Sequence, residues 1–272
     1  MACWLNGHPI EQLSPLERGF AYGDGLFSTM NVVNGHIALL DLHWQRLAQG
    51  CQRLAINSDY LDAWQQDFQR FLAVYTDHTV KIIVTRGEGG RGYLAGANAM
   101  PHCYFYAYEK TAHSLHHQQG INTGFLTTAL GLNPLLAGIK HLNRLEQVLL
   151  RQELAQTPFP EALVCDINGH VVEGVFSNVF LVRQQQLYTP RLHQAGVAGV
   201  MRQHVCTLAN ALGFSVQEQL LMADDFLAAD EIFFCNSLYG LWPVRQINSI
   251  PLGDNPVTHT LQQHLQQQLA YV

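Results

Sequence analysis

The sequence has few charged residues and lacks several common functional motifs. Only 13% of its 272 residues are charged, the formal net charge is −6, and no basic run occurs, which argues against a nucleic-acid partner. No apolar run is long enough to span a bilayer. The motifs G-x-S-x-G, H-E-x-x-H and G-x-x-x-x-G-K-[ST] are absent, so the sequence shows no serine-hydrolase elbow, zinc-protease pair or P-loop.

The cysteines also argue against a disulfide-stabilised or zinc-binding fold. The chain has six of them, scattered and without a C-x-x-C pair, and no secretory leader precedes them. They are Cys3, Cys51, Cys103, Cys165, Cys206 and Cys235. We therefore expect reduced, buried thiols in a cytoplasmic protein.

The length and hydrophobic content predict two globular domains. Hydrophobic residues make up 48% of the chain, and 272 residues suffice for two domains of ordinary size. The polar stretch EKTAHSLHHQQG has no hydrophobic period, so we expect an interdomain linker at 111–120, between an N-terminal α/β domain (1–110) and a C-terminal domain (121–272). His113, His116 and His117 have metal-like spacing, but no cysteine or acidic cluster joins them, which favours solvated linker histidines and no metal site.

Apolar periodicity predicts the elements of the N-terminal part. Strand patterns with Asn-Gly turns occupy the first residues and 26–33, and further strands are expected at 80–85 and 102–108. Two helices are expected between them, one with Asp41 as N-cap and the other over about 58–73.

Lysine is scarce, and Lys140 stands out among the three in the chain. It lies in LLAGIKHLNRLEQVLL, where Leu142, Leu145, Val148 and Leu149 recur at helical spacing and predict a helix that begins near Lys140 and turns this face to a core. A lysine beside an apolar run can be partly desolvated, which favours the free amine that Schiff-base chemistry requires. The alternative is a surface lysine whose stem lies along apolar neighbours.

Two arginine-bearing segments are candidates for anion binding in the N-terminal part. Arg46 lies off the apolar stripe of its predicted helix, where a solvated charge is the ordinary interpretation. The loop RGEGGRGY follows a buried strand and carries Arg91 and Tyr93; it can pair with a carboxylate or be a surface hairpin tip. The stretch Gly23-Asp24-Gly25 lacks the further carboxylates of a calcium loop, so we expect a turn.

The C-terminal part offers three more candidates. Glu173 ends an apolar strand, and a buried carboxylate usually has a cationic partner. The glycine-rich turn AGVAGV opens a helix whose first N–H groups, at Val200 and Met201, would suit a phosphate, although a core-packing helix start is the alternative. Asn236 and Ser237 end another buried strand, where they can donate to an anion or begin a turn.

These pieces together resemble one enzyme family, the fold-type IV pyridoxal-phosphate enzymes, which include the branched-chain and D-amino-acid aminotransferases. The similar segments extend over nearly the whole chain, and the one from Gly138 to Leu149 is the most specific. They are FAYGDGLFSTMNVVNGHIALLDLHWQRL, VTRGEGGRGY, LAGIKHLNRLEQVLLRQEL, TPRLHQAGVAGVMRQ and CNSL. The resemblance implies a two-domain α+β fold, with a small N-terminal α/β domain and a larger C-terminal domain built on a mainly antiparallel sheet or barrel.

The resemblance also implies residue roles and a homodimer that binds pyridoxal 5′-phosphate. Lys140 would form the Schiff base and Glu173 would pair with the pyridinium nitrogen. The phosphate would be held by Arg46, by the backbone of Val200 and Met201, and by Asn236 and Ser237. The substrate would be contacted by Arg91, Tyr93, Phe27 and Thr29.

Within the family the sequence is most similar to the lyases, which release pyruvate from an amine that carries an enolpyruvyl ether. The aminotransferases often carry a tyrosine near the lysine or an acidic residue after the GDG strand, whereas here those regions read KHLNRLEQ and LFSTM. The alternatives are an aminotransferase of D- or branched-chain amino acids and a non-catalytic vitamin-binding protein. The loop that carries Arg91 argues against the last, because a cofactor carrier needs no second anion site.

Overall fold

The computed structural model describes residues 2–96, 99–110 and 119–269. The described chain divides into two compact units. Unit 1 consists of residues up to 110 together with 140–143, and unit 2 of residues 119–139 and 144–269. Most of the predicted linker, including His113, His116 and His117, lies outside the described residues.

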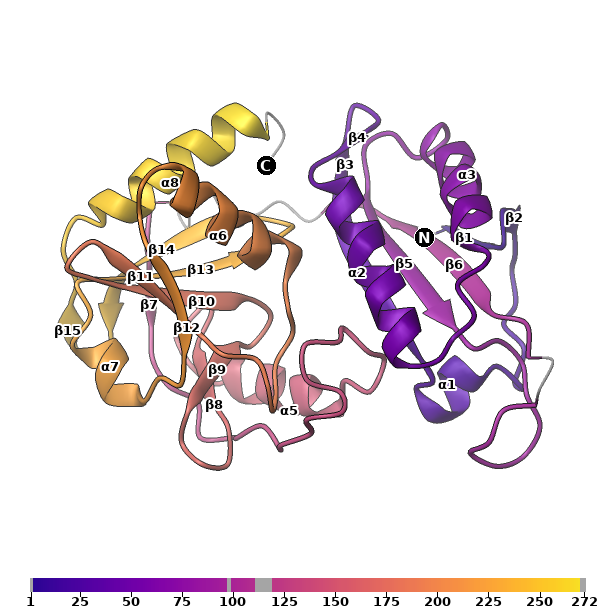
Figure 1. The fold of residues 1–272 in the computed structure, drawn as a ribbon, viewed down its shortest axis with the longest axis horizontal. Coiled ribbons are helices and arrows are strands. Elements are labelled where there is room, and N and C mark those ends of the chain that lie inside the picture. The colour runs from indigo at the N-terminus through magenta and orange to yellow at the C-terminus, as the bar shows by residue number, and fades with distance from the viewer. Residues whose placement is uncertain (1, 97–98, 111–118, 270–272) are drawn as a thin grey trace. The chain divides into compact units, whose positions relative to one another are not determined.

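Unit 1 is an antiparallel sheet with helices on it (Figure 1). The six strands run in the order β2-β1-β6-β5-β3-β4. Their bounds are β1 Ala2–Leu5, β2 His8–Pro9, β3 Gly25–Val33, β4 His36–Ile37, β5 Thr79–Thr85 and β6 His102–Tyr108. The helices are α1 Arg18–Tyr22, α2 Leu40–Arg53 and α3 Leu61–Leu72.

Aromatic side chains join α2 and α3 to the same face of this sheet. Trp44 of α2 packs edge-on against Phe68 of α3, at 5.7 Å between ring centroids, and Phe68 contacts Phe105 of β6 at 5.2 Å. The predicted helices and strands of this part are confirmed in type and to within a few residues. The predicted N-cap Asp41 is wrong, because α2 begins at Leu40 and its N-cap is Leu39, two residues earlier, in a left-handed conformation.

The side chains of β3 show that one face of the sheet is covered and the other is more open. Leu26, Ser28, Met30 and Val32 are buried, whereas the residues between them are only half-buried. Successive side chains of a strand point to opposite faces, so Phe27 and Thr29 lie on the face opposite to Ser28. Both predicted substrate-contacting residues of β3 therefore lie on the open face.

Unit 2 is built on a seven-stranded sheet in the order β12-β11-β10-β13-β14-β15, with β7 pairing with β14. Among the described strands of this sheet, the β11–β12 and β14–β7 pairs are parallel and the other pairs are antiparallel. The strands are β7 Ile121–Thr123, β10 Asn178–Arg183, β11 Gln186–Pro190, β12 Val216–Gln219, β13 Glu231–Asn236, β14 Gly240–Ile247 and β15 Ile250–Pro251. A separate hairpin joins β8 (Leu163–Cys165) to β9 (Val171–Gly174).

The core of unit 2 lies on both sides of the large sheet. On one side α6 (Val200–Ala211) and α8 (Pro256–Gln268) pack on β13 and β14. On the other side Leu163 and Val171 of the small hairpin join a buried cluster with Phe234 and Trp242. Two shorter helices, α5 (Leu145–Leu154) and α7 (Ala223–Leu227), complete the unit. The predicted α+β fold with a mainly antiparallel C-terminal sheet is confirmed.

The predicted start and buried face of the helix near Lys140 are wrong. Helix α5 begins at Leu145, and Leu145, Val148 and Leu149 are about half or more exposed, whereas Leu150 and Leu154 are buried. Residues 140–143 are extended because their backbone pairs with β3, which satisfies the groups that a helix would otherwise have bonded. None of the described helices is both long and apolar enough to cross a membrane.

Candidate functional site

Lys140 is held on an extended segment at the edge of β3. The N–H of Phe27 donates to the carbonyl of Lys140 at 2.9 Å, and the N–H of Leu142 donates to the carbonyl of Gly25 at 3.0 Å. The Lys140 Nζ lies 4.7 Å from the centroid of the Phe27 ring. The lysine that the sequence singled out is therefore half-buried and placed by backbone bonds to the strand that carries Phe27 and Thr29.

A second lysine contacts the same ring. The Nζ of Lys81, on β5, lies 4.5 Å from the Phe27 centroid, and burial lowers the pKa of Lys81. Lys81 pairs in register with Thr29, so the strand pairing brings it here. The sequence analysis missed Lys81, although the scarcity of lysine was a signal that could have found it.

Arg46 is fixed against the covered side of β3 by two polar residues. Its Nη2 donates to the Ser28 Oγ at 2.6 Å, and the same hydroxyl lies 2.7 Å from Nδ1 of His43. The Ser28 hydroxyl therefore links the Arg46 guanidinium to the His43 ring. Burial, with the nearby charges of Arg46 and Lys140, lowers the pKa of His43 well below its usual value, so this imidazole is neutral. Arg46 is thus a positioned cation and not a freely solvated side chain.

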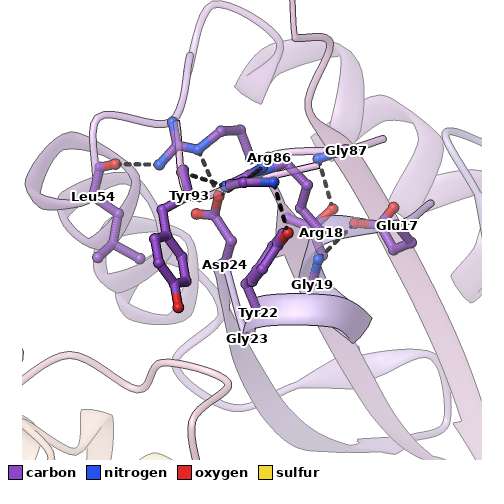
Figure 2. A network of polar contacts seen from close by, with 12 residues as sticks. Glu17, Arg18, Gly19, Tyr22, Gly23, Asp24, Leu54, Arg86, Gly87 and Tyr93 are labelled. Carbon is purple, nitrogen blue, oxygen red and sulfur yellow. Dashed lines mark hydrogen bonds and ion pairs between the residues drawn. The ribbon is translucent and has the colours of Figure 1, made fainter. Parts of the chain in front are cut away.

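Arg91 and Tyr93 lie on an exposed loop of unit 1. Tyr93 is 90% exposed, and Arg91 is also exposed. The backbone of this loop is nevertheless bonded to buried Arg18, whose guanidinium donates to the carbonyls of Gly92 and Tyr93 (Figure 2). Asp24 binds Arg18 and Arg86 with its carboxylate, and the preceding Gly23 is the left-handed C-cap of α1, two residues before β3 begins. The sequence analysis did not single out Arg18.

Glu173 is a buried carboxylate of unit 2, at the end of β9. Its Oε2 accepts a hydrogen bond from the N–H of Val197 at 2.9 Å. The Val197 segment pairs with Gly138, two residues before Lys140 in the chain. Arg144 interacts electrostatically with Glu173: burial lowers the pKa of Arg144, and the charges of Glu173 and Glu146 oppose that change. Glu173 therefore has the cationic neighbour that a buried carboxylate requires.

Helix α6 begins three residues after Val197, at Val200. Val200 and Met201 are its first residues and are buried, and their N–H groups belong to the first turn, which has no intrahelical acceptors. Gly199 is the N-cap, and within the described ranges no side chain caps it. Asn178 donates to the carbonyl of Val197 at 2.8 Å, which holds the approach to the helix.

Asn236 is engaged in a turn. Its Oδ1 accepts from the N–H groups of Leu238 and Tyr239, and its Nδ2 donates to the carbonyl of Phe176 at 3.3 Å. The Asn236 side chain therefore stabilises the β13–β14 turn, which is one of the two roles that the sequence left open for it. Ser237 is the next residue of the same turn and is half-buried.

These residue types fit a phosphorylated pyridine aldehyde. A partly buried amine suits the aldehyde, a buried carboxylate suits a protonated ring nitrogen, and a helix N-terminus and a fixed arginine suit a phosphate. Lys140, Phe27 and Arg46 belong to unit 1, and Glu173 and the start of α6 belong to unit 2. In residues 2–96, 99–110 and 119–269, no group of three or more His, Cys, Asp or Glu residues is arranged to hold a metal ion.

The chain is similar to known lyases and aminotransferases over nearly its whole length. A solved 4-amino-4-deoxychorismate lyase from Pseudomonas aeruginosa is 42% identical, with a TM-score of 0.95 and coverage of 99% of this chain and 100% of that one. Aminodeoxychorismate lyase of Vibrio harveyi is 36% identical over 270 residues, which cover 96% of this chain and 98% of the relative. D-alanine aminotransferase of Bacillus licheniformis is 27% identical over 92% of this chain and 89% of its own length.

A family model described as amino-transferase class IV matches residues 25–247. The match begins at the first residue of β3 and ends at the last residue of β14, so it spans Lys140, Glu173 and the start of α6. The chain therefore belongs to the amino-transferase class IV family.

Proposed function

We propose that this chain is a pyridoxal-phosphate-dependent carbon–oxygen lyase that converts 4-amino-4-deoxychorismate to 4-aminobenzoate and pyruvate, a step of folate synthesis. The observation that carries the proposal is the similarity over the full length to two lyases of this name, at 42% and 36% identity. An aminotransferase in the same family, at 27% identity, is the basis for the alternative function.

Each candidate residue would have its own role in binding the cofactor. Lys140 would bind its aldehyde carbon through Nζ, and Glu173 would accept a hydrogen bond from its protonated ring nitrogen. Arg46, the N–H groups of Val200 and Met201, and the Asn236–Ser237 turn would bind its phosphate. Bound pyridoxal phosphate supplies an electron sink, which stabilises the electron pair left when a proton leaves carbon.

The residues of this chain would move one proton and release one group. Lys140 Nζ removes the proton from the carbon that bears the substrate amine. The enolpyruvyl C–O bond then breaks, pyruvate leaves, and the ring becomes aromatic, which makes the step effectively irreversible. Arg91 and Tyr93 bind a substrate carboxylate, while Phe27 and Thr29 line the substrate site.

We also propose that the chain forms a homodimer and acts in the cytoplasm. Leu145, Val148 and Leu149 lie on one side of α5 and are 72%, 50% and 49% exposed, an apolar surface that a second copy would bury. The six cysteines are free thiols, the state that a reducing compartment maintains.

The test is to supply purified protein with freshly made 4-amino-4-deoxychorismate and to follow 4-aminobenzoate fluorescence and pyruvate in parallel. We expect both products to appear in equal amounts. If a yellow, cofactor-loaded protein forms neither product but transfers an amino group from D-alanine or a branched-chain amino acid to a keto acid, the aminotransferase assignment replaces this one. A protein that binds the cofactor and catalyses neither reaction would be the vitamin-binding protein.

A further inference from the structure

The loop Gly87–Tyr93, called here loop 87–93, is ordered despite its composition. Four of its seven residues are glycine, and Gly87 and Gly92 have φ of +85° and +104°. Glycine loses more conformational freedom on folding than any other residue, so such a loop needs strong contacts to keep one conformation. The side chains of Arg91 and Tyr93 are exposed, and the Tyr93 ring has one edge-on contact, with the Tyr22 ring at 5.7 Å.

Arg18 supplies the main contacts. The side chain is 3% exposed, and all three guanidinium nitrogens donate to separate acceptors. Nη1 donates to the carbonyl of Gly92 at 3.0 Å, Nη2 to that of Tyr93 at 2.7 Å, and Nε to Oδ2 of Asp24 at 2.9 Å (Figure 2). Only the rigid fork of arginine can reach acceptors in this arrangement, because a lysine would offer one nitrogen.

Asp24 holds Arg18 in place and also binds Arg86. The Nε of Arg86 donates to the same Asp24 oxygen at 2.9 Å. The remaining Arg86 nitrogens donate to the carbonyls of Ala55 and Leu54, just after α2. One carboxylate thus joins two guanidinium groups to the end of a helix. A charged group in such a network is held more firmly than by one surface ion pair.

Further bonds tie loop 87–93 to the segment that contains Arg18. The N–H of Gly92 donates to the hydroxyl of Tyr22 at 3.0 Å, and the Arg18 guanidinium lies 4.8 Å from the centroid of the Tyr22 ring. The N–H of Gly89 donates to the carbonyl of Leu16 at 3.0 Å. Both sides of Arg91 are therefore fixed at the backbone, while its side chain stays exposed.

We infer that Arg18, held by Asp24 and Arg86, is a positioning residue that fixes loop 87–93 and so presents Arg91 and Tyr93 to a substrate carboxylate. The second half of this inference rests on the proposed function. With the loop fixed, binding the carboxylate does not require the loop to be ordered at that moment. Without Arg18 that ordering would oppose binding and raise KM.

Limited proteolysis with trypsin tests the anchor without reference to activity. Trypsin cleaves after arginine, so the Arg91–Gly92 bond reports how often the loop opens. We expect Arg18→Met to accelerate cleavage after Arg91 about tenfold or more, because it removes three hydrogen bonds from a charged donor. The matched control is Arg70→Met, which removes an exposed arginine paired with Asp67 on α3 and should leave this cleavage rate unchanged. Mass spectrometry of the fragment that ends at Arg91 gives the rate.

Kinetics of the cofactor-loaded enzyme test the consequence for substrate. We expect Arg18→Met to raise KM about tenfold and to leave kcat within about twofold, because Arg18 acts through the loop and not on the reacting atoms. Arg18→Lys should not restore KM. If Arg18→Met does not fold, Tyr22→Phe, which removes one bond to Gly92, should still raise cleavage after Arg91 and KM by a smaller factor.

The outcomes distinguish the anchoring of loop 87–93 by Arg18 from the role of this anchoring in substrate binding. Unchanged cleavage after Arg91 in Arg18→Met, or in Tyr22→Phe if only that variant folds, overturns the anchor. Faster cleavage with an unchanged KM overturns its role in substrate binding. If the wild-type enzyme has no lyase activity, the proposed function fails together with the substrate role, and proteolysis alone decides whether Arg18 fixes the loop.

Discussion

Replacement of Glu17 by glutamine should destabilise unit 1 strongly at neutral pH and hardly at all in acid. Glu17 is 3% exposed and lies just before α1. Its Oε1 accepts from the N–H of Gly19 at 2.9 Å, and its Oε2 lies 2.8 Å from His102 Nδ1 and 2.7 Å from the Tyr104 hydroxyl. Burial alone would raise the pKa of Glu17, but the hydrogen bonds from His102, Tyr104, Gly19 and Thr85 outweigh it and lower the pKa from 4.5 to about 2.

The magnitude follows from this pKa. Each pKa unit corresponds to about 1.4 kcal/mol, so the folded protein gains about 3 kcal/mol from the ionised Glu17 relative to the unfolded chain. Because the folded pKa is lower than the unfolded one, this stabilisation is complete above about pH 5.5 and is lost as the pH falls from 4.5 through 2. By the same linkage, about 2 kcal/mol of the stabilisation by Glu17 remains at pH 3.5 and about 1 kcal/mol at pH 2.5.

Urea unfolding of wild type and Glu17→Gln, followed by tryptophan fluorescence, measures this difference. Three of the four tryptophans, Trp4, Trp44 and Trp64, lie in unit 1, so the signal reports mainly on that unit. Glu11→Gln is the matched control, since Glu11 is exposed, and it should change the unfolding free energy by less than about 0.5 kcal/mol. A difference between wild type and Glu17→Gln that stays constant from pH 7 to pH 2.5 would refute the reasoning.

Three further predictions concern unit 2 and the candidate site. Lys140→Ala should lower kcat by about a thousandfold or more, because it removes both the nucleophile and the base. In the wild-type protein, borohydride reduction should attach the cofactor to the Lys140 peptide alone among the three lysines. Substantial activity retained by Lys140→Ala would contradict the assignment. Gly199→Ala should destabilise the protein by about 1–3 kcal/mol in thermal unfolding, since its Cβ would lie 2.1 Å from Oδ1 of Asn178. The matched control is Gly253→Ala, whose Cβ would meet no atom within 4 Å and whose backbone does not have a positive φ, so it should change the stability little. Burial raises the pKa of Glu161 from 4.5 to about 7 despite bonds from Ser177 and nearby N–H groups, so this residue should lower the unfolding free energy by about 3 kcal/mol as the pH rises from 4.5 through 7. Glu161→Gln should remove that pH dependence, and an unchanged slope in urea unfolding would exclude Glu161 as its source.

The elements of unit 1 were predictable because each carries its own periodic signal. Trp44, Leu47 and Cys51 recur at helical spacing in the sequence, and all three residues are buried on α2. The alternation in β3 and the Asn-Gly turns likewise depend on neighbours in the sequence. Such signals are local, since side-chain direction along a strand or helix follows from backbone geometry alone.

The helix at Lys140 could not be placed in the same way. Leu145, Val148 and Leu149 have the spacing of a buried face, yet α5 leaves them largely exposed and begins five residues after the lysine. A periodic pattern shows that a face is apolar and does not show what covers it. The pairing of residues 140–143 with β3 joins positions more than a hundred residues apart, and no local pattern encodes it.

The sequence by itself determined the residues that carry chemistry: a scarce lysine in a specific segment, a carboxylate at a strand end, and a glycine-rich turn before a helix. Only the tertiary structure decided how they are held, by showing Lys140 bonded to β3, His43 neutral beside Arg46, and Arg18 buried under loop 87–93. The physical reason is that residue type sets what a side chain can do, whereas burial and hydrogen-bond partners, which set its charge state and direction, come from segments distant in the chain.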